Sequence, residues 1–185
     1  MTAARSSWAG RVGAAWGVLG VLALLGQAFA RLGPRALEAW TMGLSPSQLV
    51  VLAAWTGFMI YSEGVRGFHR RFSPRVVARA MWLREHPRPL FVAIAPFFCM
   101  SLVHASKRGL VVARVLVFAI VLLVAVVSQM PQPWRGIVDA GVVAGLGIGA
   151  ASILWFAARA LAGTRPPIAP DLPATDDAVA GTRVE

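Results

Sequence analysis

Long apolar stretches alternate with short basic ones along this chain. Residues 12–30 form nineteen positions without a charged side chain, and residues 110–129 and 136–162 are comparably apolar. About 20 apolar residues in an α-helix are enough to cross the hydrocarbon core of a bilayer. Residues 46–61 form a shorter apolar stretch that we also expect to cross. The pattern therefore predicts an all-α protein, a polytopic membrane helix bundle with four spans.

Two serine–proline pairs mark where helices begin. Ser45 precedes Pro46, and Gln48 lies three positions after the serine. This order is typical of a helix that starts with proline and is closed at its N-terminus by a capping box. A second serine–proline pair at residues 73–74 repeats the signal, and we expect that helix to stop before Pro87.

The segment after the second apolar stretch, residues 62–89, is the most basic part of the chain. It carries seven arginines: Arg66, Arg70, Arg71, Arg75, Arg79, Arg84 and Arg88. A cluster this basic beside a membrane span stays on the cytoplasmic side. In its second half, one helical stripe contains Arg75, Arg79, Trp82 and His86, and another contains Val76, Ala80 and Leu83. We therefore expect a basic amphipathic helix at the membrane surface.

Residues 90–105 can be read in two ways, because sixteen residues interrupted by Pro96 are short for a full span. If they cross, there are five spans, with Arg31, Arg35, Lys107, Arg108, Arg159, Arg165 and Arg183 outside. If they enter and leave from the cytoplasm, there are four, with only Arg31, Arg35 and Arg135 outside and the other fifteen Lys and Arg residues inside. The positive-inside rule favours four spans plus a re-entrant or surface-embedded segment, with both termini cytoplasmic.

The remaining segments connect or end the spans. Residues 31–44 link the first two spans, with the glycine–proline pair at 33–34 as a break. A basic start and the triplet Ala-Phe-Ala at 28–30 leave open a cleaved secretory signal, although we expect an uncleaved first span. Residues 163–185 are rich in Pro, Asp and Thr, so we expect a disordered tail after a single membrane domain at residues 1–162.

Composition supports a membrane location. The chain has 185 residues, 57% of them hydrophobic, a mean hydropathy of +0.66 and a formal net charge of +10. These values exclude an ordinary soluble domain. Its arginines separate apolar runs instead of covering a soluble surface, so we expect anionic lipid headgroups as partners and no nucleic acid.

The basic segment has two interpretations. In the first, it is a collar that contacts lipid and fixes the topology, in which each arginine near anionic lipid contributes about 1 kcal/mol. In the second, it is a shaped site for phosphate or carboxylate, because arginine forks bind such groups through two parallel hydrogen bonds. The anion-binding candidates are Arg66, Arg70, Arg71, Arg75 and Arg79.

Few other residues offer chemistry. Glu63, His69 and His104 are the candidates for proton transfer. These histidines and His86 are too widely spaced for the i, i+4 pair of many metal sites, so we expect no metal. No cofactor motif is visible, and we expect none to be bound. The single cysteine, Cys99, lies in an apolar run and is typical of a buried, inert thiol.

The last apolar stretch carries a helix-packing motif. Gly141, Gly145 and Gly149 recur every four residues, which lets another helix approach closely. That helix is either a span of the same chain or one from a second copy or a membrane-protein partner. Asp139 lies near the start of the same stretch, four residues after Arg135, so a structural ion pair is the simplest interpretation.

Three stretches carry a family resemblance: YSEGVRGFHRRFSPRVVARA at 61–80, APFFCM at 95–100 and PQPWRGIVDAG at 131–141. They resemble those of small, uncharacterised bacterial inner-membrane proteins, over most of the chain except both termini. The resemblance implies a multi-pass location in the bacterial inner membrane. It implies no activity and assigns no residue a role.

Two functions fit these observations. The first is a non-enzymatic scaffold or assembly factor whose arginine-rich cytoplasmic face binds anionic lipid or an acidic partner. The second is a small membrane enzyme or carrier for a phosphorylated or carboxylated lipid-like substrate. In it, Arg66, Arg70 and Arg71 would clamp the anion, while Glu63, His69 or His104 would transfer protons. A dense basic segment without a matching catalytic set favours the first.

Overall fold

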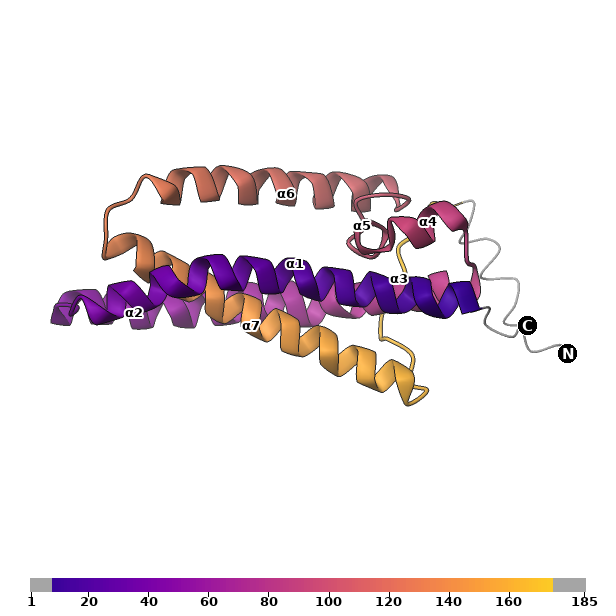
Figure 1. Ribbon diagram of the computed structural model, residues 1–185, viewed down its shortest axis with the longest axis horizontal. Helices are drawn as coiled ribbons and strands as arrows, with labels where there is room; N and C mark the ends of the chain where they lie inside the picture. The colour runs from indigo at the N-terminus through magenta and orange to yellow at the C-terminus, as the bar shows by residue number, and fades with distance from the viewer. Residues whose placement is uncertain (1–7, 175–185) are drawn as a thin grey trace, which may run out of the picture. The chain divides into compact units, whose positions relative to one another are not determined.

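The computed structural model of the protein describes residues 8–174, and over this range the chain forms helices and no strand (Figure 1). Three of the helices described there are long and apolar enough to cross a membrane: α1 (Trp8–Thr41), α6 (Lys107–Ser128) and α7 (Trp134–Leu161). The all-α class is confirmed. The three helices contain all or nearly all of the predicted spans 12–30, 110–129 and 136–162.

The other apolar stretch forms α2 (Pro46–Met59), which has only 14 residues. Its predicted capping box is present, since the Gln48 amide donates to Ser45 Oγ (3.4 Å) and the Ser45 amide donates to Gln48 Oε1 (2.9 Å). The helix does not end in a loop. It continues directly into a π-helix, η1 (Ile60–Phe72), and then into α3 (Ser73–Glu85).

The predicted break at residues 33–34 is wrong, because α1 runs through Pro34 to Thr41. Packing in the last turns explains this. Gly136 of α7 lies directly against Ala39, and Gln132 Nε2 donates to the Arg35 carbonyl at 3.4 Å. Pro34 removes the backbone hydrogen bond to the Ala30 carbonyl, and these contacts with α7 hold the turns that follow it in place.

Contacts divide the chain into two compact units where we expected one domain. Unit 1 comprises described residues 8–21, 74–118 and 156–174, and unit 2 comprises residues 22–73 and 119–155. The long helices α1, α6 and α7 contribute to both units.

In unit 1, α3 forms the core and does not lie as an amphipathic helix on a surface. Val76, Val77 and Leu83 are at most 2% exposed, and Trp82 from the expected polar stripe is also buried. A row of glycines on α1 explains the burial, since it admits other segments closely. These contacts join Gly10 to the Arg84 backbone, Gly13 to Leu83 and Val92, Gly17 to Ala95 and Cys99, and Gly20 to Pro96.

The ambiguous residues 90–105 begin with two five-residue helices, α4 (Pro89–Ala93) and α5 (Ala95–Cys99) (Figure 1). Neither is long enough to cross a bilayer. Trp16 of α1 donates its indole N–H to the Ala93 carbonyl at 3.2 Å, where the first short helix ends. This segment therefore packs against α1 within unit 1.

In unit 2, the glycine row of α7 receives α2 and η1 of the same chain. A Cβ at Gly141 would meet Trp55 and Met59, one at Gly145 would meet Glu63, and one at Gly149 would meet Phe68. Trp55 also donates its indole N–H to the Val138 carbonyl at 3.1 Å. The glycine motif of α7 therefore packs against helices of the same chain, which is one of the two arrangements considered from the sequence.

The expected disorder after residue 162 is wrong for the part of the tail that the structure describes. Leu172 is only 1% exposed, and the carbonyls of Pro170 and Asp171 accept hydrogen bonds from Arg79. Unit 1 thus holds the tail through side-chain burial and backbone carbonyls, which composition does not reveal. Residues 175–185 lie outside the described residues.

Candidate functional site

The π-helix η1 is the most unusual element of the chain. Its 13 residues contain Glu63, Arg66, His69, Arg70 and Arg71. A π-helix closes hydrogen bonds between residues i and i+5, and it normally occurs as a single turn, frequently at functional sites. The candidate residues of unit 2 therefore share one wide helix.

The side of η1 that faces α7 follows this wider step. Met59 and Glu63 lie near Gly145, a Cβ at Gly64 would be 3.0 Å from Ile148 Cδ1, and Phe68 lies against Gly149. These contacts recur every four to five residues, as the i to i+5 step requires. The glycine row of α7 thus accommodates this wide helix at close range.

The same step gathers three exposed arginines. Arg66, Arg70 and Arg71 are exposed, and Arg70 and Arg71 follow Arg66 by four and five residues. In a π-helix both spacings correspond to about one turn. In an α-helix, with 3.6 residues per turn, Arg71 would lie about 140° around the axis from Arg66. We call Arg66, Arg70 and Arg71 the arginine stripe.

Hydrogen bonds fasten the end of η1 to α7. His69 Nδ1 and Ser152 Oγ are 2.9 Å apart, and Ser73 Oγ donates to the Gly149 carbonyl at 3.4 Å. Sequence reasoning considered His69 for proton transfer, but it did not identify Ser152. Ser152 lies three residues after Gly149, on the packing face of α7, and this spacing was the only sequence signal for its contact with η1.

Glu63 lies on the α7 side of η1, since its Cβ would be 3.4 Å from a Cβ placed on Gly145. The side chain remains exposed. Glu63 and His69 belong to unit 2, whereas His104 belongs to unit 1. The three candidates for proton transfer therefore do not all belong to one compact unit.

His104 sits among aromatic rings of unit 1. Its ring centroid lies 4.6 Å from that of Phe91, 6.3 Å from Phe98 and 6.4 Å from Trp82. Such ring pairs contribute packing energy beyond their buried area. Because His104 is half-buried, this environment is typical of a histidine at the edge of an aromatic core.

Arg79 of unit 1 is completely buried. Its Nε donates to the Phe98 carbonyl at 2.6 Å, and its Nη atoms donate, all at 2.9 Å, to the carbonyls of Pro170, Asp171, Val103 and His104. A guanidinium has five N–H donors, so these five bonds use its full capacity. The central carbon of the guanidinium, Cζ, also lies 4.1 Å from the centre of the Phe98 ring.

The backbone around Arg79 adopts unusual angles. Ser101, His104 and Asp171 have φ values of 61°, 50° and 54°, which non-glycine residues rarely adopt. His104 and Asp171 are themselves acceptors for Arg79. Burial lowers the pKa of Arg79 to about 10, so the guanidinium remains charged at neutral pH. Arg79 therefore binds the chain itself, and we remove it from the anion-binding set.

Three neighbouring arginines of unit 1 differ from Arg79. Arg75 is half-buried, whereas Arg84 and Arg88 are exposed. The guanidinium carbon of Arg88 lies 5.8 Å and 5.6 Å from the ring centres of Trp82 and Phe91. This geometry is typical of a cation–π contact at the edge of an aromatic core.

Cys99 is 1% exposed, and burial raises the pKa of its thiol to about 12. A thiol in this state is a poor nucleophile. Within residues 8–174 no group of three or more His, Cys, Asp or Glu side chains could hold a metal ion.

Asp139 is 3% exposed, and its Oδ2 has no hydrogen-bond partner among the described residues. Arg35 and Arg135 supply the nearby positive charge. Arg135 Nε is likewise buried without a hydrogen-bond partner in the described part of the chain, so the ion pair expected from the sequence is not seen there.

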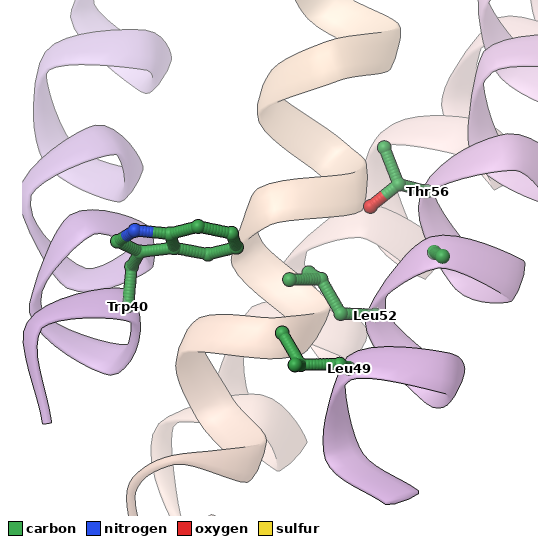
Figure 2. Close-up of a pocket in the computed structure, with 5 residues that line it drawn as sticks. Trp40, Leu49, Leu52 and Thr56 are labelled. Atoms are coloured by element: carbon green, nitrogen blue, oxygen red, sulfur yellow. The ribbon is translucent and has the colours of Figure 1, made fainter. Parts of the chain in front are cut away.

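Unit 2 contains an open pocket with a volume of about 360 Å³ (Figure 2). Trp40 of α1 and four residues of α2 line it: Leu49, Leu52, Ala53 and Thr56. The indole N–H of Trp40 and the hydroxyl of Thr56 are the polar side-chain groups of this lining, and the Thr56 hydroxyl is buried without a hydrogen-bond partner in the described part of the chain. The pocket offers no charged group to a phosphate or carboxylate, so it is not the anion site.

Comparison of the chain with models of protein families, with curated proteins and with solved structures found no match. The function is therefore inferred from the geometry described above.

Proposed function

We propose that this protein is an integral membrane protein whose arginine stripe binds anionic lipid headgroups, and that it acts as a non-enzymatic scaffold or assembly factor. One observation carries the proposal: Arg66, Arg70 and Arg71 are exposed on a helix that directly continues an apolar one. Arginines in this position, next to a membrane segment, attract anionic headgroups.

Chain continuity favours lipid over an acidic protein as the partner. Val50, Phe58 and Ile60 are exposed apolar residues on α2 and at the start of η1. Exposed apolar side chains of a membrane protein contact acyl chains, so the arginines that follow six to eleven residues after Ile60 lie at headgroup level. Tyr61, 57% exposed between the two regions, is a residue typical of the interface.

The proposal includes a topology. We place four spans in a bacterial inner membrane, with α2 and the start of η1 as the second span, and with both termini and the arginine stripe cytoplasmic. The two short helices α4 and α5 support a re-entrant or surface-embedded segment. The distribution of arginines supports the orientation.

Cysteine accessibility tests this topology. In a Cys99→Ala background, we expect a cysteine at Ser106 to react with an impermeant reagent only from the cytoplasm. One at Ser128 should react only from outside. Labelling of the Ser106 position from outside would establish five spans and would contradict the four-span proposal.

Lipid binding by the purified full-length protein tests the function. We expect Arg66→Gln, Arg70→Gln and Arg71→Gln together to weaken binding of phosphatidylglycerol by about 100-fold. Each arginine near anionic lipid contributes about 1 kcal/mol, and each 1.4 kcal/mol is a factor of ten. Native mass spectrometry of lipid adducts in mild detergent provides the measurement.

A matched control changes Arg11, Arg108 and Arg165 to glutamine. These arginines are also exposed, and the net charge falls by the same amount. We expect this variant to retain most of the lipid binding, because these three arginines belong to three separate segments of the chain and do not share one helical turn. If the stripe variant binds lipid like wild type, the lipid proposal fails. If it loses a co-purifying acidic protein while lipid binding is unchanged, that protein is the partner instead.

A further inference from the structure

We propose that the arginine stripe selects lipids with a phosphomonoester headgroup, such as phosphatidate, over lipids with a phosphodiester headgroup. This inference rests on the proposed function, because it specifies which anionic headgroup the same site prefers. It follows from the number of guanidiniums that the π-helix gathers and from the rigidity with which they are held.

The first step concerns charge. Three guanidiniums within about one helical turn repel one another unless an anion lies among them. A phosphodiester carries a single negative charge. A phosphomonoester carries about −1.5 to −2 at pH 7 and has three strong acceptor oxygens. It therefore matches the arginine stripe better in both charge and number of acceptors.

The second step concerns the residues that could neutralise the stripe from within. Glu63 is the only acidic residue of η1, and its Cβ lies on the side toward Gly145 of α7. The His69 ring is hydrogen-bonded to Ser152 on the same α7 helix. Both side chains are thus directed to the packing side, so the charge of the stripe is available to an external anion.

The third step concerns preorganisation. Phe68 against Gly149, Gly64 against Ile148 and the Ser73 hydrogen bond fix η1 on α7 at several points along its length. A helix held this way presents its arginines without paying for backbone ordering when the ligand binds. Arginine forks then select by geometry, since they form two parallel hydrogen bonds to phosphate oxygens.

The experiment compares two lipids on the full-length protein in mild detergent, with adducts counted by native mass spectrometry. Dioleoyl phosphatidate is the phosphomonoester, and dioleoyl phosphatidylglycerol is the phosphodiester with the same chains. We expect wild type to bind phosphatidate at least about tenfold more tightly, which corresponds to one additional charge-assisted hydrogen bond.

A variant that keeps charge and removes the forks isolates the geometric part. It carries Arg66→Lys, Arg70→Lys and Arg71→Lys. We expect it to bind phosphatidylglycerol as wild type does and to lose most of the preference for phosphatidate. Lysine is a point charge without a planar fork. A lysine variant that retains the full preference would overturn the geometric argument.

The remaining outcomes separate the two proposals. Equal binding of both lipids by wild type overturns this inference and leaves the proposed function standing. Absence of binding to either lipid overturns both. Inorganic phosphate at millimolar concentration is the third probe. If it displaces phosphatidate completely, the site recognises free phosphate, and the assignment to a lipid is wrong.

Discussion

Arg79 and the arginine stripe use the same side chain in opposite ways. Arg79 is completely buried, and all five of its donors bind backbone carbonyls. The arginine stripe, eight or more residues earlier, is exposed on a π-helix. The first organises unit 1, whereas the second is presented by unit 2. Density of arginine in a sequence therefore does not indicate which arginines can bind a ligand.

Arg79 differs from the arginine stripe because distant parts of the chain supply its hydrogen-bond acceptors. Arg79 receives carbonyls from residues 98–104 and 170–171, up to 92 positions away. The arginine stripe faces away from the helix that its own element packs on. Substitution of Arg79 should therefore affect folding, whereas substitution of the arginine stripe should affect ligand binding and leave stability nearly unchanged.

Arg79→Leu should produce the largest loss. Each buried acceptor left unsatisfied costs about 1–3 kcal/mol, so we expect the free energy of unfolding to fall by at least about 3 kcal/mol. For a chain of this length the melting temperature would then fall by about 6–12 °C. Thermal unfolding in detergent, followed by size-exclusion chromatography, measures this.

Arg79→Lys sharpens the same test, because lysine has three donors where arginine has five. We expect it to recover only part of the loss. Arg108→Leu removes an exposed arginine of unit 1 and serves as the control, with little change expected. Arg79 would not be the organiser of unit 1 if Arg79→Leu unfolded no earlier than this control.

Gly149→Ala should produce an intermediate loss in unit 2. The new Cβ would lie 2.6 Å from Phe68 Cδ1, so the π-helix or α7 must shift. Overpacking of this kind costs about 1–3 kcal/mol. Gly147→Ala on the same helix is the control, since its nearest neighbour, Phe29, would be 3.9 Å away. We expect this control to be neutral or slightly stabilising; equal melting temperatures for the two variants would refute the close contact.

Ser152→Ala should have a smaller effect, because it removes one partly buried hydrogen bond to His69. We expect a loss of about 1 kcal/mol or less, measured as a shift in melting temperature. Ser62→Ala is the control, since the Ser62 hydroxyl donates to the Phe58 carbonyl at 2.7 Å, within its own helical stretch. A larger loss for Ser62→Ala would show that the His69 contact does not fasten η1.

The triple glutamine variant of the arginine stripe should have the smallest effect on stability. Surface substitutions away from special features usually change stability by less than about 0.5 kcal/mol each. We expect an unchanged melting temperature together with weaker lipid binding. A large fall in melting temperature would erase the contrast with Arg79, because the stripe would then be structural as well.

Local properties of the sequence predicted much of the fold. Apolar runs of about the length that a bilayer requires identified α1, α6 and α7, and the order Ser45-Pro46-Ser47-Gln48 identified the start of α2 with its capping box. These features depend on residues a few positions apart. They are therefore visible without knowing what packs against them.

The features that sequence reasoning missed depend on distant partners. The burial of α3, the continuation of α1 through Pro34 and the capture of Leu172 all follow from contacts between segments far apart in the chain. One signal was available and unused: Gly10, Gly13, Gly17 and Gly20 form a row on α1. That row predicts a close neighbour for the first span. The π-helix had no comparable signal.

The carbonyl partners of Arg79 also have an evolutionary consequence. A carbonyl oxygen is present whatever the side chain, so residues such as Val103 and Pro170 could be replaced while Arg79 keeps its acceptors. A salt bridge behaves differently, because its two members must change together. Among homologues, position 79 should therefore remain arginine while its partners vary, and the sequence record would show a fixed residue without a covarying one.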